Sequence, residues 1–147
     1  MLNKLKTFFK QELDIKENES SEQQLQRACA ALLIEVTRAD FEKTQEEKDK
    51  VASLLQSKFN LSETQLQALI AQVEENEADT TSVYPFTSLI KEQYDYEQRV
   101  NVIRLMWKVA YADGELDRFE DDVIRKTADL LYVRHSDFIQ AKLEQAP

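Results

Sequence analysis

The sequence predicts an all-α protein, a single helical bundle of seven to eight helices. Three observations support this fold class. The 147 residues include one glycine and two prolines, too few for the tight turns that connect β-strands. Leu, Ala, Glu, Gln and Lys, which lose little on entering a helix, are abundant. Apolar residues recur at spacings of three and four along most of the chain, and the length suits one domain over residues 1–147.

The first 19 residues are predicted to be a peripheral segment, with an amphipathic helix over residues 2–14 and a polar link. The apolar stripe of this helix would consist of Leu2, Leu5, Phe8 or Phe9, and Leu13. Lysines at positions 4, 6 and 10 surround it. We expect it to pack on the bundle, and contact with an anionic membrane surface through residues 1–14 is the less favoured alternative.

The next three helices are expected over residues 22–39, after Thr44 and after Ser62. The first is apolar nearly all round between positions 28 and 34, so it should be central. Its Cys29, the single cysteine, is expected to be a buried, inert thiol. Ser62 and Gln65 have the spacing of a capping box, in which each side chain bonds the other residue's backbone N–H.

In the second half, residues 76–82 are predicted to form a polar loop, and a short helix is predicted to begin at Pro85. A second central helix should begin near Asp95, with Gln98 as its capping-box partner, and another should follow Asp117. Ser136 is expected to cap a last short helix, with the single histidine, His135, at the surface. Three aromatic residues of this half are expected to pack in the core and the turn: Trp107, Tyr111 and Phe119.

A shift of 73 positions lays residues 32–49 over residues 105–122, with identity at seven of the eighteen positions. The shared text, A-D-x-E-x(4)-E, covers the end of each central helix and the start of the next. Since a helix pair cannot bury its apolar face alone, we expect an internal duplication of a helix–acidic turn–helix unit whose copies pack together.

Helix capping accounts for some of the acidic residues in these two segments. Thr44 with Glu47, and Asp117 with Glu120, have the spacing that satisfies the first N–H groups of a helix. Asp40 and Asp113 instead lie at predicted helix C-termini, where a negative charge costs roughly 0.3–1 kcal/mol.

Three interpretations of the acidic turns stay open: a divalent cation site, a purely structural turn, and a docking surface for a basic partner. Clustered carboxylates suit hard cations such as Ca²⁺ or Mg²⁺, although the spacing is not that of an EF-hand. The candidate metal ligands are Asp113, Glu115, Asp117, Glu120, Asp40, Glu42 and Glu47.

The net charge of −9 would repel phosphate backbones and attract cations or a basic protein, so we expect a protein partner and no nucleic acid. The sequence has no secretory signal pattern and no apolar run of transmembrane length, which predicts a cytoplasmic protein.

The second half also resembles the TerB-like family, which is named for bacterial tellurite resistance. The resemblance rests on residues 110–117, Glu120, residues 124–125, 128–131 and 135–139, and on Pro85-Phe86-Thr87. It implies a compact helical bundle with acidic turns suspected of binding a divalent cation, and a role in stress or tellurite-resistance systems. It also implies that Asp113, Glu115, Asp117 and Glu120 match the family motif best, whereas Phe41 and Thr44 depart from it in the first copy.

The sequence therefore favours a non-enzymatic binding or scaffold protein of this type. The alternative is a metal-dependent hydrolase using the same carboxylates, which would need an open coordination position and a substrate pocket.

Overall fold

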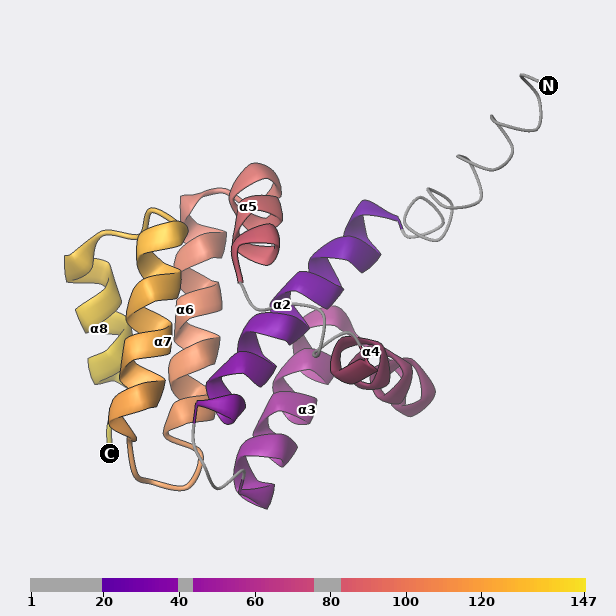
Figure 1. Cartoon of the computed structure of the whole chain (residues 1–147), viewed down its shortest axis with the longest axis horizontal. Helices are drawn as coiled ribbons and strands as arrows, with labels where there is room; N and C mark the ends of the chain where they lie inside the picture. Colours follow the sequence, from indigo (N-terminus) through magenta and orange to yellow (C-terminus); the bar gives the residue numbers. More distant parts are fainter. Residues whose placement is uncertain (1–19, 40–43, 76–82) are drawn as a thin grey trace.

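The computed structural model describes residues 20–39, 44–75 and 83–147, and within these ranges the chain forms seven α-helices and no β-strand. The predicted all-α class is therefore confirmed (Figure 1). The predicted helix over residues 2–14 and the predicted loop over 76–82 lie outside the described residues. The helices are α2 (Ser21–Arg38), α3 (Gln45–Phe59), α4 (Glu63–Glu75), α5 (Tyr84–Gln93), α6 (Tyr96–Ala110), α7 (Arg118–Leu130) and α8 (His135–Gln145).

Local sequence sets most of the helix starts. Reciprocal capping boxes form at Ser62 with Gln65, at Asp95 with Gln98 and at Asp117 with Glu120, as predicted. A further box, Ser20 with Gln23, opens α2. At α3 the Thr44 side chain accepts a hydrogen bond from the backbone N–H of Glu47 at 3.2 Å.

The start of α8 differs from the prediction that Ser136 caps it. The N-cap is Arg134, which has no side-chain capping bond, and the helix begins at His135. A tertiary contact takes the place of a cap: the Tyr96 hydroxyl accepts from the Arg134 N–H at 3.1 Å and donates to the Asp137 carboxylate. The start of α8 is thus fixed by a residue of α6, and the sequence around Ser136 carries no sign of this contact.

The two helices expected at the centre do form the core. In α2, residues 28–34 are all buried, and Leu32 and Leu33 are wholly inaccessible. In α6, Ile103, Met106 and Trp107 are equally buried. Helix α2 contacts five other helices and α6 contacts four, so the prediction of two central helices is confirmed.

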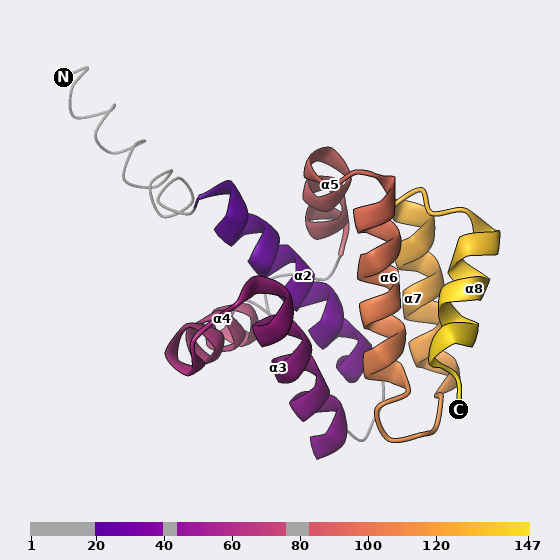
Figure 2. The same cartoon turned by 180° about the vertical axis from the view of Figure 1, so that it is seen from behind.

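The views in Figures 1 and 2 place α3 and α4 on one side of the central pair and α7 and α8 on the other. Helix α3 also contacts α6, and α7 also contacts α2, so each half of the chain packs on the other's central helix. The α6–α7 turn, the C-terminal end of α2 and the start of α3 lie at one end of the molecule, called the acidic end below (Figure 1). None of the helices in the described part of the chain has the length and apolar character that a membrane crossing requires.

Candidate functional site

The turn between α6 and α7 holds three of the predicted ligands, and a fourth, Glu120, lies in the first turn of α7. The backbone reverses at Gly114, whose φ of +85° lies in the region that only glycine adopts easily. A side chain there would meet no atom within 4 Å, so the glycine serves conformation and not space. The Asp113 Oδ1 accepts a hydrogen bond from the Glu115 N–H at 3.0 Å, which closes the turn, and both residues are exposed.

Asp117 and Glu120 are occupied by the start of α7. The Asp117 Oδ1 accepts from the Phe119 N–H at 2.7 Å, and the Glu120 Oε1 accepts from the Asp117 N–H at 3.1 Å. The Asp117 side chain also accepts from the backbone N–H of Glu120, so both carboxylates take part in capping. A carboxylate has two oxygens with about four acceptor positions, so capping does not exhaust either group.

The acidic turn before α3 is described only from Thr44 onward, and Asp40 and Glu42 lie outside the described residues. Glu47 is the third residue of α3, as Glu120 is the third residue of α7. The two side chains share a feature that the sequence analysis missed. Glu47 is 0% exposed and Glu120 is 1% exposed.

A signal for this burial was present in the sequence. Glu47 precedes the buried Val51 and Leu55 at intervals of four, and Glu120 precedes Ile124 and Ala128 in the same way. Residues four apart lie on the same helix face, so each glutamate continues an apolar stripe into the core. Both also lie in the first turn, where the helix dipole favours a negative charge.

The burial of Glu120 also explains the position of Phe119, one of the three aromatic residues expected in the core and the turn. One residue turns an α-helix by about 100°, so the neighbour of an inward-facing residue faces outward. Phe119 is accordingly 52% exposed at the start of α7, beside the turn, and is not a core residue. Trp107 is fully buried and Tyr111 is half-buried against it, with ring centroids 6.1 Å apart.

Among the described residues, no group of three or more His, Cys, Asp or Glu side chains is close enough to hold a metal ion. Because Asp40 and Glu42 are not described, the full predicted set is untested, and the metal site stays a prediction.

Asp121 is a neighbouring acid with a structural role. Its carboxylate receives Lys142 of α8 at 2.7 Å and Arg125 at 3.1 Å. Burial alone would raise the pKa of Asp121, but the hydrogen bonds and charges of Lys142 and then Arg125 outweigh it and lower the pKa. The ion pair therefore fastens α8 to the first turns of α7.

Cys29 has the surroundings of a structural residue. Burial raises the pKa of its thiol to about 11, against weaker opposing effects of the Lys58 charge and a hydrogen bond with Tyr94. A cysteine nucleophile needs a lowered pKa, because the thiolate is the reactive form. The predicted burial of Cys29 is confirmed.

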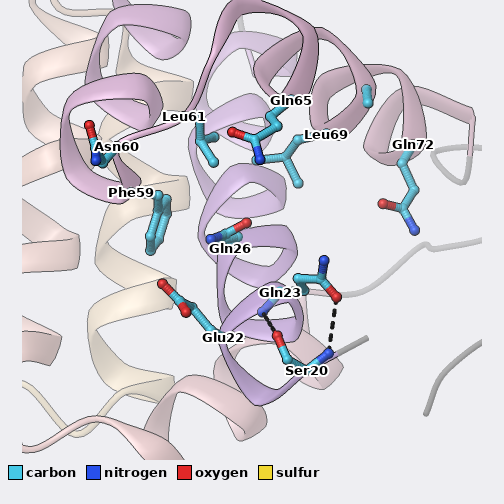
Figure 3. A pocket seen from close by; sticks show the side chains of 11 residues that line it. Ser20, Glu22, Gln23, Gln26, Phe59, Asn60, Leu61, Gln65, Leu69 and Gln72 are labelled. Carbon is cyan, nitrogen blue, oxygen red and sulfur yellow. Dashed lines mark hydrogen bonds between the residues drawn. The ribbon is translucent and has the colours of Figure 1, made fainter. Parts of the chain in front are cut away.

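Two open grooves lie on the described surface. One, of about 570 Å³, is near the acidic end, between α3 and the end of α6, and is lined by charged residues such as Asp49, Lys50 and Lys108. The other, of about 480 Å³, lies between α2 and α4. Figure 3 shows its lining side chains coming from the start of α2 on one side and from the α3–α4 connection and α4 on the other.

Comparison with known proteins agrees with this helical architecture. No curated protein and no solved structure gave a significant match. A family model described as tellurite resistance protein TerB matches residues 26–143, which include every described helix except the ends of α2 and α8. The chain belongs to the TerB family.

Proposed function

We propose that this chain is a non-enzymatic binding domain of the TerB type, and that the acidic end of the bundle is its binding site. The observation that carries this proposal is the burial of Glu47 and Glu120 at matching positions of α3 and α7. Burying a carboxylate is costly, and two such groups at one end of a small domain indicate a use beyond solubility. The context of that use is a cytoplasmic stress or tellurite-resistance system.

The ligand we favour is a divalent cation, Ca²⁺ or Mg²⁺. The turns at this end carry Asp113 and Glu115 at the surface and Asp117 at the rim. Oxygen ligands of this kind suit hard cations, and the capping bonds leave each carboxylate further acceptor capacity. The net charge of −9 adds a general attraction for cations. Asp40 and Glu42 of the first turn would complete the set.

We further infer that the two acidic turns are copies of one unit. Helices α2, α3 and α4 follow one another as α6, α7 and α8 do. Helix α3 packs on α6 as α7 packs on α2, which is the arrangement expected of two units related by a twofold axis. Such an axis would bring both turns to one end, where they could share a ligand or bind two.

A protein partner with a basic surface is the remaining part of the proposal. The exposed acids of the α6–α7 turn and the adjacent open groove would give a partner access to the same end. Bound cations would lower the negative charge there, so cation and partner binding would be coupled. The sequence alternative, a metal-dependent hydrolase, gains no specific support, because the groove near these carboxylates is open and lined by lysines as well as acids.

Calorimetric titration of Ca²⁺, Mg²⁺ and Zn²⁺ tests the cation. We expect wild-type protein to bind Ca²⁺ or Mg²⁺, and Asp113→Asn to bind at least about tenfold more weakly, since it loses a charged ligand. Glu97→Gln, an exposed acid at the start of α6, is the matched control and should bind as wild type does. No heat with any ion, or heat unchanged in Asp113→Asn, would remove the cation from the proposal.

A further inference from the structure

The groove between α2 and α4 is lined by both apolar and polar side chains. Its larger apolar residues are Phe59, Leu61 and Leu69, from the end of α3, the α3–α4 connection and α4. Phe59 and Leu61 are half-buried, so part of each side chain contacts the core and part faces the groove. The polar part is dominated by glutamines, whose flexible amides can both donate and accept hydrogen bonds; these are Gln23, Gln26, Gln65 and Gln72.

The corresponding place in the second half of the chain is bridged by side-chain contacts. A shift of 73 residues puts Tyr96 where α2 has Gln23, and α8 starts 72 residues after α4, which puts Asp137 where α4 has Gln65. Tyr96 donates a hydrogen bond to Asp137. The Arg134 guanidinium lies 4.8 Å from the centre of the Tyr96 ring. An aromatic ring and a cation therefore close the α6–α8 contact, whereas glutamines leave the α2–α4 contact open.

We propose that residues 2–14 of this same chain dock in the groove between α2 and α4. These residues precede the described part of the chain, which begins at Ser20. Ser20 itself lines the groove. The segment that leads into α2 is thus tethered at the groove's edge, so docking within one chain benefits from a high effective concentration.

The length of the segment fits the distance to be covered. Residues 15–19 would form the connection, and two packed helices are commonly joined by about two to eight residues. Five residues reach roughly 17 Å when extended, and a helix over residues 2–14 would be about 20 Å long. The link can therefore reverse the chain and lay the helix along the first turns of α2 and across α4.

The chemistry of the segment also fits the groove. In a helix, Leu5 and Phe9 are four residues apart and share one face, which would meet Phe59, Leu61 and Leu69. Phe9 would supply the ring that Tyr96 supplies in the second half. The first ten residues contain three lysines and no acid, whereas Glu22 lies on the groove wall and the whole chain carries −9. Attraction between these charges would orient the segment.

This inference is independent of the cation proposal, because the groove is lined by the start of α2, the end of α3 and α4, at the other end of α2 and α3 from the acidic end (Figure 1). Its test uses the full chain. Glutamine side-chain amides give their own NMR signals, and the groove carries four of them. We expect Leu5→Ser/Phe9→Ser to shift the side-chain signals of Gln26, Gln65 and Gln72. The signal of Gln140, an exposed residue of α8, should stay in place.

The matched control is Asn3→Ser/Thr7→Ser, which changes two polar residues on the opposite face of the predicted helix. It should leave the groove signals where they are in wild type. Unchanged groove signals in Leu5→Ser/Phe9→Ser would overturn the proposal. Equal shifts in both double variants would overturn it too, because they would show that no particular face is docked.

A spin label decides whether the occupant belongs to the same molecule. In a Cys29→Ala background, a nitroxide on Gln11→Cys should broaden the Gln65 and Gln72 side-chain signals when label and ¹⁵N are in one chain. In a second sample, spin-labelled protein without ¹⁵N is mixed with ¹⁵N-labelled protein that carries no nitroxide. The Gln65 and Gln72 signals should stay sharp in this mixture. Broadening in the mixture as well would mean docking onto a second copy, and would overturn the proposal. Broadening in neither sample, with sedimentation of the protein on anionic vesicles, would assign the segment to membranes instead.

Discussion

Glu47 and Glu120 are the residues whose positions say most about this chain. Each is the third residue of its helix, and each side chain is removed from solvent. A carboxylate is among the groups least often fully buried, because desolvation of its charge costs several kcal/mol. The helix N-terminus offsets part of this cost through its dipole and free N–H groups. The same residue type at the same helix position in both halves indicates a common role.

Gly114 gives a direct test of the acidic turn at the residue level. Because its φ is +85°, we expect Gly114→Ala to destabilise the protein by about 1–2 kcal/mol through backbone strain. Steric clash should add nothing, since the space around a new Cβ is empty. Chemical denaturation measures the loss, and Gly114→Asn, which tolerates a positive φ better, should lose less. Equal stability of wild type and Gly114→Ala would contradict the turn geometry.

Cys29 should give the stability a dependence on pH in the alkaline range. The thiol of the unfolded chain ionises near pH 8.5, whereas burial raises the pKa of Cys29 in the folded protein to about 11. Between these values the unfolded state releases a proton and the folded state keeps it, so rising pH favours unfolding. We expect the free energy of unfolding to fall more steeply over this range in wild type than in Cys29→Ala. Urea titrations at a series of pH values check this, and identical slopes would contradict it.

Some helix boundaries are set by side chains close in the sequence, and others by tertiary contacts. Capping boxes at Ser62, Asp95 and Asp117 are visible in the sequence because donor and acceptor are three residues apart. The start of α8 is set instead by Tyr96, which is 38 residues from Arg134 along the chain. A helix start held by so distant a residue has no local signature, and for that reason Ser136 was wrongly expected to be the cap.

Tyr96→Phe tests this contact between α6 and α8. The substitution keeps the ring, with Arg134 and Arg99 over it, and removes the hydroxyl that bonds Asp137 and the Arg134 N–H. We expect a loss of about 1–3 kcal/mol, because one hydrogen bond is to a charged group. Thermal and urea unfolding measure it. Tyr132→Phe is the control, since Tyr132 is 69% exposed and its ring contact with Lys91 survives; a loss as large there would argue against the specific contact.

For the molecule as a whole, the central pair of helices should form the most stable unit. Helices α2 and α6 contain the wholly buried Leu32, Leu33, Ile103 and Met106 and contact one another. Among the described helices, α4 packs closely against α2 and α3 only, and much of its surface is exposed. Its local unfolding should therefore cost less than global unfolding.

Amide hydrogen exchange followed by NMR tests this ranking. We expect the slowest amides in the middles of α2 and α6, exchanging only through global unfolding, and faster exchange throughout α4. Titration with denaturant should show α4 opening in a smaller, less denaturant-dependent step. Protection in α4 equal to that in α2 would contradict this ranking.

The sequence by itself determined the helical class, the two central helices and most helix starts, because these depend on apolar spacing and on side chains within four residues of their partners. It also identified the acidic turn and the family to which the chain belongs. Only the tertiary structure decided that Glu47 and Glu120 are buried, that α8 is held by Tyr96 and that a groove separates α2 from α4. The physical reason is range: periodicity and capping are local, whereas burial and grooves arise where residues far apart along the chain pack or fail to pack.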